Sequence, residues 1–189
     1  MAQHTVPFSS QYADLGHHEW RARGCGIASL HMVMRFWHAA DPALGMPTLD
    51  ALLERGRAIG AYRDGIGWSH GGLVTLAREY GYTGYNVDHA ANGPTPHDTD
   101  ASWAALTTEL DRGPVLVSVY SGLDPDRGGG HIVVVTGAAD GLVFFNDPEE
   151  MHAWEGRRIL ALPAFLRVYK RRYIVIRPGS SSVTPAAST

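Results

Sequence analysis

The chain has 189 residues, 44% hydrophobic and 19% charged, which is typical of a globular protein with its own core. Its formal net charge of -3 argues against nucleic acid as a partner, and its single cysteine excludes an internal disulfide. No stretch approaches the roughly 18 apolar residues of a membrane span, and the first residues lack a secretory signal, so we expect a cytoplasmic protein without a membrane partner.

Apolar residues recur at helical spacing through the first half of the chain, where they predict four helices. Residues suited to helix ends flank them, such as the N-cap Thr48 and the C-terminal Gly81. The predicted helices cover residues 25–40, 48–59, 73–80 and 103–112. The segments 1–24 and 91–100 are rich in polar and turn-forming residues, so we predict that both are irregular.

Short runs of β-branched and aromatic residues in the second half of the chain predict strands. The predicted strands cover residues 115–120, 131–138, 142–147 and 173–178, with one further short helix over 163–169. Asp140-Gly141 predicts a tight hairpin that makes the middle two strands antiparallel neighbours. Helices followed by strands predict an α+β fold. We expect one domain over residues 1–178 and a disordered polar tail over 179–189.

Cys25 stands at the start of the first predicted helix, between Gly24 and Gly26. The unpaired N–H groups and the helix dipole at such a position favour a thiolate, which is the nucleophilic form of cysteine. The two glycines are expected to leave the sulfur open to a substrate. A lone cysteine is nevertheless more often a buried packing residue, so Cys25 alone does not predict an enzyme.

A histidine and an aspartate in the second half of the chain supply the partners that a thiolate nucleophile needs. His131 opens one predicted strand and Asp147 closes the next, so the hairpin brings both to the same edge of the sheet. Each also has an ordinary interpretation, as an exposed strand-start histidine and as an Asp-Pro turn. Their joint placement with an accessible cysteine favours a catalytic triad in which Asp147 orients His131.

Three segments contain these residues and share a family resemblance. They read VPFSSQYAD (6–14), GCGIASLHMVMRFW (24–37) and GGHIVVVTGAADGLVFFNDPEE (129–150). Together they resemble the papain-like C39 peptidase superfamily, specifically its C39-like family-2 branch. The resemblance implies a papain-like fold in which N-terminal helices pack on a C-terminal antiparallel sheet. It also implies that Cys25 is the nucleophile, His131 the general base and acid, and Asp147 the orienting residue.

The same resemblance implies a glutamine ahead of the cysteine that stabilises the oxyanion. Gln11, in VPFSSQ, matches the family's glutamine block. The position six before the cysteine often carries glutamine in related sequences, but here it is Glu19, whose carboxylate would repel a developing oxyanion. We therefore predict that Gln11 and the Cys25 backbone N–H are the two donors. The alternative interpretation of Gln11 is a plain surface residue.

These residues predict a cysteine hydrolase, a peptidase or amidase that forms a thioester acyl-enzyme on a peptide or an amide-bearing small molecule. An amide-forming acyltransferase would use the same triad with an amine acceptor, and the sequence does not separate the two. A non-catalytic peptide-binding module with a papain-like cleft is a third hypothesis, and a transglutaminase-like fold ranks below it. The substrate and the oligomeric state stay open.

Other signals in the sequence do not support a cofactor. Neither HExxH nor CxxC occurs, and RGGGH lacks the ending of a phosphate-binding loop, so we predict no metal and no cofactor. Asp64, Trp68 and His70 lie in a glycine-rich loop with two interpretations, a lining of the cleft and an ordinary connecting loop, of which we favour the second.

Overall fold

A six-stranded antiparallel sheet forms the middle of the molecule, in a computed structural model that describes residues 3–92 and 96–179. The strand order across the sheet is β3-β8-β4-β5-β6-β7. Its strands are β3 (Tyr82–Asp88), β4 (Val115–Val119), β5 (His131–Ala139), β6 (Leu142–Asn146), β7 (Arg157–Ala161) and β8 (Tyr169–Pro178). A separate hairpin consists of β1 (Tyr62–Arg63) and β2 (Gly67–Trp68).

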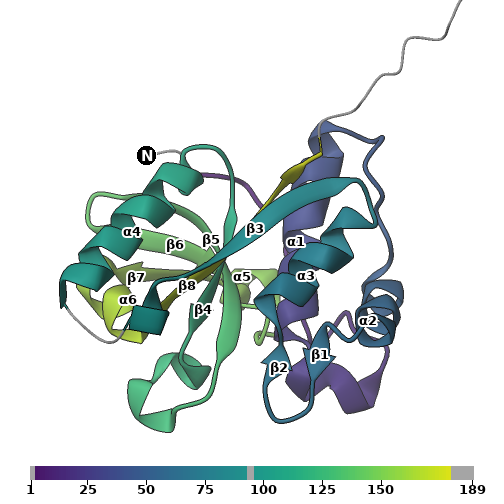
Figure 1. Ribbon diagram of the computed structural model, residues 1–189, viewed down its shortest axis with the longest axis horizontal. Coiled ribbons are helices and arrows are strands. Elements are labelled where there is room, and N and C mark those ends of the chain that lie inside the picture. The colour runs from purple at the N-terminus through teal and green to yellow at the C-terminus, as the bar shows by residue number, and fades with distance from the viewer. Residues whose placement is uncertain (1–2, 93–95, 180–189) are drawn as a thin grey trace, which may run out of the picture.

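Helices cover both faces of the large sheet (Figure 1). The α-helices are α1 (Cys25–Ala40), α2 (Leu49–Ala58), α3 (His70–Arg78), α4 (Pro96–Leu110), α5 (Ala153–Gly156) and α6 (Leu162–Val168). Short 3-10 helices are η1 (His18–Arg23), η2 (His89–Asn92), η3 (Ser121–Leu123) and η4 (Pro125–Arg127). The helices α1, α2 and α3 pack on one face of the sheet, and α4 and α6 pack on the other.

The two faces of the sheet contribute to two hydrophobic cores. In β4, Leu116 packs with α1–α3, whereas Val115 and Val117 pack with α4 and α6. Successive strand residues point to opposite faces, so a strand covered on both faces needs an unbroken apolar run. This explains why the central strands show no polar alternation in the sequence.

The predicted α+β fold, with helices first and an antiparallel sheet after them, is confirmed. The first helix spans the predicted residues 25–40, and the predicted hairpin joins β5 to β6. The prediction that residues 91–100 are irregular was wrong in its second half, because α4 begins at Pro96. Proline is well suited to the first position of a helix, where its missing N–H leaves no bond unmade.

Two edge strands and the first part of β8 were missed by the sequence analysis. The exposed strand β3 carries polar residues such as Thr83 and Asn86, and β7 alternates exposed with half-buried positions. The strand β8 begins at Tyr169, four residues before the predicted start, with the charged residues Lys170 and Arg172. Edge strands need little apolar character, because one side of their backbone pairs and the other faces solvent.

The segment before α1 is packed against the rest of the molecule although most of it lacks regular structure. Gln3 forms an isolated bridge with Gly137, and Val6 and Leu15 are buried. At the other end, the Gly179 N–H donates to the Gly81 carbonyl at 2.9 Å, and the rest of the predicted tail, 180–189, lies outside the described residues. Within 3–92 and 96–179, no helix is both long and apolar enough to cross a membrane.

Candidate active site

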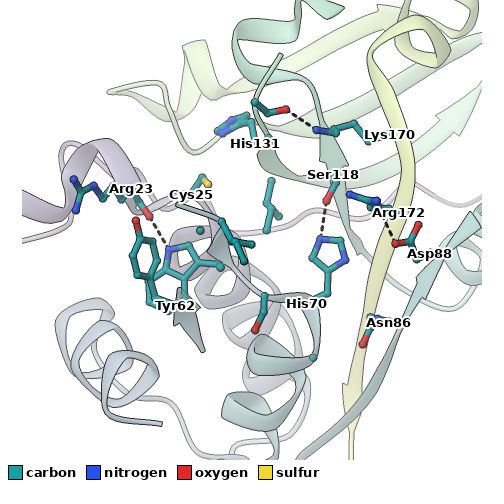
Figure 2. Close-up of a pocket in the computed structure, with 18 of the residues that line it drawn as sticks. Arg23, Cys25, Tyr62, His70, Asn86, Asp88, Ser118, His131, Lys170 and Arg172 are labelled. Atoms are coloured by element: carbon teal, nitrogen blue, oxygen red, sulfur yellow. Dashed lines mark hydrogen bonds and ion pairs between the residues drawn. The ribbon is translucent and has the colours of Figure 1, made fainter. Parts of the chain in front are cut away.

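A cleft of about 670 Å³ lies between the helical side of the molecule and the large sheet. Cys25, at the first position of α1, and His131, at the first position of β5, both line it. Figure 2 shows the two side chains facing one another near the middle of the cleft. The structure therefore brings together two residues that are far apart in the sequence, at a surface that a ligand can reach.

The start of α1 presents unpaired backbone donors beside the Cys25 sulfur. The first helical hydrogen bond runs from the Ala28 N–H to the Gly24 carbonyl, so the N–H groups of the preceding turn have no partner within the helix. The backbone N–H groups of Gly26 and Ile132 help to lower the pKa of the Cys25 thiol. Cys25 itself is partly exposed, as a nucleophile must be.

The two glycines around Cys25 serve packing rather than substrate access, contrary to the expectation from the sequence. A Cβ on Gly26 would lie 2.7 Å from Cγ of Trp68, and a Cβ on Gly24 would lie 3.0 Å from Cβ of Gln11. Both contacts are closer than real Cβ atoms normally come. The absence of side chains at these two positions lets Trp68 and Gln11 approach the helix start closely.

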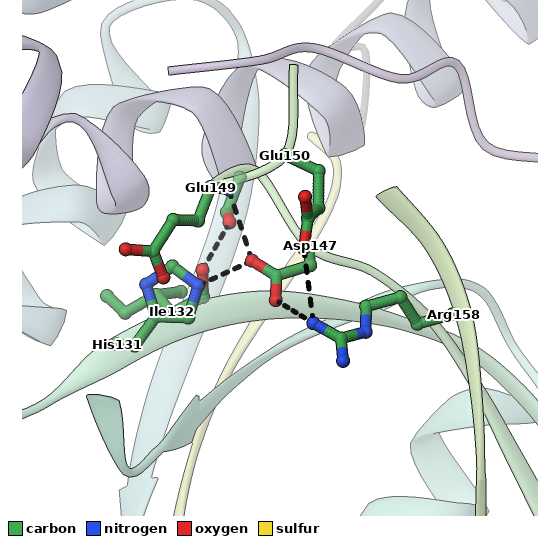
Figure 3. A network of polar contacts seen from close by, with 7 residues as sticks. His131, Ile132, Asp147, Glu149, Glu150 and Arg158 are labelled. Carbon is green, nitrogen blue, oxygen red and sulfur yellow. Dashed lines mark hydrogen bonds and ion pairs between the residues drawn. The ribbon is translucent and has the colours of Figure 1, made fainter. Parts of the chain in front are cut away.

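His131 and Asp147 form the predicted contact at the edge of the sheet. His131 Nε2 donates to Asp147 Oδ1 at 2.7 Å, and both side chains are buried. Asp147 also accepts from the Glu149 N–H at 3.1 Å and from Arg158 Nη1 at 3.4 Å (Figure 3). Because its carboxylate is held on several sides, Asp147 fixes the orientation of the His131 ring and leaves Nδ1 for Cys25.

The electrostatics of the three residues favour a thiolate–imidazolium pair. Burial alone would raise the pKa of the Cys25 thiol, but the hydrogen bond and charge of His131 outweigh it and the pKa is lowered. Burial likewise opposes the charged form of His131, yet Asp147 and Cys25 raise the pKa of the imidazole above its ordinary value. The pKa of Asp147 is lowered against the effect of burial by its bond to His131.

A buried hydrogen bond ties α1 to β5 beside the site. Ser29, one turn along the helix from Cys25, donates its hydroxyl to the Ile132 carbonyl at 2.9 Å. Ile132 directly follows His131, so this bond connects the element that carries the sulfur to the strand that carries the imidazole. Its complete burial protects it from competition by water.

Comparison with known proteins agrees with this geometry. The family model described as Peptidase_C39 like family matches residues 3–176. The chain belongs to this family. No sequence among curated proteins matches the chain.

Solved structures of C39-like peptidase domains share the fold. A protein described as a C39-like peptidase from Bacillus anthracis aligns with a TM-score of 0.61 at 18% identity, over 92% of this chain and 96% of that one. A double glycine motif protease from an AMS/PCAT transporter, solved with its leader peptide, aligns with a TM-score of 0.55 at 19% identity, over 94% of both chains. The peptidase domain of Streptococcus ComA, a bifunctional ABC transporter, aligns with a TM-score of 0.52 at 18% identity, over 83% of this chain and 93% of that one.

Gln11 lies next to the start of α1 in this C39-like chain, and Glu19 lies on the surface. Gln11 is buried, which makes the alternative interpretation as a surface residue wrong, and its Oε1 has no hydrogen-bond partner among the described residues. Glu19 belongs to η1 and is exposed, with its carboxylate 3.6 Å from Nδ1 of His17. Gln11 is the better candidate of the two because it lies beside the start of α1 and carries an amide, whereas Glu19 carries an exposed carboxylate.

The cleft has an aromatic end that the sequence analysis interpreted as an ordinary loop. Trp68 lines the cleft, stacks edge-on against Tyr62, and donates its Nε1–H to the Arg23 carbonyl at 2.6 Å. Ile66, between them in the sequence, is exposed and also lines the cleft. Tyr62 opens β1 and Trp68 closes β2, so the two aromatic residues pair across this hairpin. This aromatic pair is the feature of the sequence that could have indicated a cleft wall here. We call Arg23, Tyr62, Ile66 and Trp68 the aromatic arm.

The other end of the cleft is polar and was missed almost completely. We call its residues the polar arm, and they are His70, Asn86, Asp88, Ser118, Lys170 and Arg172. His70 Nε2 lies 2.8 Å from Ser118 Oγ, and Arg172 Nε lies 3.0 Å from Asp88 Oδ2 (Figure 2). Most of these side chains come from β3 and from the start of β8, the two stretches that periodicity did not predict as strand.

One group of side chains in the site has the composition of a metal site. His131, Asp147 and Glu149 offer ligand atoms that all lie within 4.8 Å of one another. A metal ion there would compete with the His131 proton for the Asp147 carboxylate. The 2.7 Å hydrogen bond between the two side chains accounts for their approach without a metal.

Proposed function

We propose that this C39-like protein is a cysteine peptidase or amidase with Cys25 as nucleophile, His131 as general base and acid, and Asp147 as orienting residue. The observation that carries the proposal is the mutual arrangement of the three groups. A thiol of lowered pKa at a helix start faces a buried imidazole, and a carboxylate holds that imidazole at 2.7 Å. The family membership of the chain supports the same reaction class.

The reaction begins with attack of the Cys25 thiolate on a peptide or amide carbonyl. The sulfur–carbon bond forms, and the carbonyl oxygen becomes an oxyanion beside the start of α1. His131 then gives its proton to the leaving nitrogen, the carbon–nitrogen bond breaks, and a thioester remains on Cys25. Water attacks the thioester while His131 removes its proton, and the carboxylic acid leaves with the thiolate restored.

Gln11 and the Cys25 backbone N–H are our proposed oxyanion donors. The observation that supports Gln11 is its place: its side chain is buried next to Gly24, at the start of α1. Removing one such donor in other enzymes lowers turnover by about a hundredfold or more. We therefore expect Gln11→Ala to reduce turnover by about that factor and to leave alkylation of Cys25 unchanged.

A peptide is the substrate that we propose, since a structural neighbour of this chain was solved in complex with a leader peptide. The aromatic and polar arms extend the cleft on both sides of Cys25, which suits an extended chain. Transfer of the acyl group to an amine would use the same residues, and the product formed with an added amine distinguishes transfer from hydrolysis.

Alkylation of Cys25 at pH 6 tests the thiolate without a known substrate. The single cysteine makes every alkylation event countable by intact mass. We expect iodoacetamide to modify Cys25 at least about tenfold faster than a cysteine in an unstructured peptide, because an ordinary thiol is almost fully protonated at this pH. The rate should fall towards the peptide value in His131→Ala and stay unchanged in His152→Ala, a matched change at an exposed histidine.

Turnover of a diverse peptide and amide library then tests the reaction itself. Wild type should accumulate a thioester of Cys25 that is detected by intact mass, and Cys25→Ala should accumulate none. Equal turnover by the two proteins, or a Cys25 that reacts no faster than the peptide thiol, would remove the cysteine mechanism.

A further inference from the structure

Lys170 is the only lysine of the chain, and it lies in the cleft close to His131. The chain has 16 lysines and arginines in total, and all of them except Lys170 are arginine. Lys170 Nζ donates to the Gly129 carbonyl at 2.6 Å, and a Cβ on Gly130 would lie 3.8 Å from the same nitrogen. Gly130 directly precedes His131, so the ammonium group sits beside the reaction centre. Its bonded partner here is a neutral carbonyl, which leaves its positive charge uncompensated by that contact.

Arg172 brings a second cation to the polar arm, two residues along β8. Its ion-pair partner is Asp88, which faces it across the β3–β8 ladder. Arg172 Nε is buried and makes no well-aligned hydrogen bond, although Asp88 Oδ2 is 3.0 Å away. This nitrogen of the guanidinium is therefore a donor without a well-aligned acceptor among residues 3–92 and 96–179.

The charge of the cleft is opposite in sign to that of the whole chain. The fixed cations in its lining are Arg23, Lys170 and Arg172, and the fixed anion is Asp88. The thiolate–imidazolium pair adds no net charge. The chain as a whole carries a formal net charge of -3. A positive cleft in a negative molecule focuses the field on anionic ligands.

The field of Arg172 reaches its neighbours in the polar arm in spite of Asp88. Burial and the charge of Arg172 lower the pKa of Lys170. Burial and the same charge lower the pKa of His70, so its imidazole is neutral at pH 7. An anion bound here would relieve this repulsion, and neutral donors such as the Asn86 amide lie in the same lining.

We propose that the polar arm is a subsite for a carboxylate of the substrate, held by Lys170 and Arg172. This inference rests on the proposed function, because it assigns the substrate group that lies beside the scissile bond. The carboxylate is either the C-terminal carboxylate of a short peptide or the side chain of an acidic residue. Both place the same group at the same two cations, and charge-assisted bonds to them are the strong class of hydrogen bond.

Paired alkylating peptides measure this preference at Cys25. The probes are iodoacetyl-glycine oligomers of one to three residues that end in a free carboxylate or in a carboxamide. A second set ends in glutamate amide or glutamine amide. In each reaction the thiolate displaces iodide and forms a sulfur–carbon bond, and intact mass at pH 6.5 and low salt counts the adduct. The first set reports a terminal carboxylate, and the second reports an acidic side chain.

We expect wild type to react with the carboxylate probe about tenfold faster than with its neutral partner at one probe length or more. Lys170→Met and Arg172→Met should each reduce that ratio by about threefold or more. Arg167→Met, a matched loss of a cation at an exposed position of α6 outside the cleft lining, should change it by less than about twofold. Asp88→Asn should raise it, since Arg172 loses its competing carboxylate.

Direct binding separates failure of the subsite from failure of the proposed chemistry. In Cys25→Ala, reductive methylation with a 13C label gives Lys170 a single lysine signal that keeps its charge. Acetyl-glycine peptides with a free carboxylate, or with a glutamate side chain, should shift this signal, and the amide and glutamine peptides should not. An unreactive Cys25 together with a shifted Lys170 signal would contradict the cysteine mechanism and leave the carboxylate subsite standing. The carboxylate subsite would be wrong if a reactive wild-type Cys25 showed the same rate with the carboxylate probe and with its neutral partner. It would also be wrong if the Lys170 signal did not shift.

Discussion

His131 is a buried histidine whose charge depends on its two partners. Taken alone, burial would keep the imidazole neutral, and the thiol next to it would stay protonated. The Asp147 carboxylate reverses this, because it favours the positive ring that in turn favours the thiolate. Burial opposes the charge of Asp147, but its bond to His131, followed by the Glu149 N–H and Arg158, lowers its pKa and keeps it ionised. The thiolate–imidazolium pair therefore depends on Cys25, His131 and Asp147 together and not on Cys25 alone.

Replacing Asp147 with asparagine tests this dependence. The pKa of His131 is raised and that of Cys25 is lowered, so we expect wild type to keep its thiolate at pH values where an ordinary thiol is protonated. Asp147→Asn removes the charge that stabilises the imidazolium, so the pKa of Cys25 should rise. We expect the iodoacetamide rate at pH 6 to fall by about tenfold, with recovery at pH 9, where an ordinary thiol also ionises. The measurement is the alkylation rate of Cys25 from pH 4 to 9.

Glu150→Gln is the matched control for this profile. Glu150 lies 3.3 Å from the same Arg158 nitrogen, but it does not bond His131. Its loss should leave the pH profile within about twofold of wild type. An unchanged profile in Asp147→Asn would mean that the sulfur is activated without the charge of Asp147.

At the scale of elements, the start of α1 and the β1–β2 hairpin are fitted to one another. Trp68, the last residue of β2, packs directly on Gly26 and bonds the carbonyl of Arg23 just ahead of Cys25. The indole thus closes one wall of the cleft and fixes the chain that leads into the helix. Any side chain at residue 26 would push this wall away from its position.

Gly26→Ala should therefore damage both stability and reactivity. The added methyl would meet Trp68 at 2.7 Å, and overpacking of this kind costs about 1–3 kcal/mol. Gly71→Ala is the control, because its Cβ would find only Asn86 Oδ1 at 3.8 Å, and alanine suits the helix α3 better than glycine does. Urea unfolding should show a loss of that size for Gly26→Ala and no loss for Gly71→Ala. Equal losses would mean that Trp68 moves aside freely.

The parts of the site that the sequence predicted are those with strong local signals. A tight Asp-Gly hairpin between two apolar strands sets the distance between His131 and Asp147, and a long amphipathic helix places Cys25 at its start. The polar arm had no such signal. The strand β3 is held in place by pairing with β8 in the register that joins Asp88 to Arg172, which is a tertiary property. Charged residues at the start of β8 also masked its strand pattern.

At the scale of the whole molecule, the six-stranded sheet lies between two hydrophobic cores and contributes side chains to each of them. In β8, Ile174 and Ile176 join the core under α1–α3, while Tyr173 and Val175 join the core under α4 and α6. The same alternation occurs in β4 and β5. If the sheet came apart on one side, the apolar side chains of the other core would also be exposed to water. The two cores should therefore unfold together. This is the physical basis for the expectation of one domain over residues 1–178.

Core substitutions on either side of the sheet test this coupling. Leu30→Ala removes a fully buried side chain from the core under α1–α3, and Phe165→Ala does so under α4 and α6, so each should cost about 2–5 kcal/mol. If the cores unfold together, Leu30→Ala should speed native-state hydrogen exchange of slow amides in α4 and α1 by the same factor. Ile159→Ala, at an exposed position of β7, should change both little. Faster exchange confined to α1 would show two independent units, and the cleft between them would then open and close as they separate.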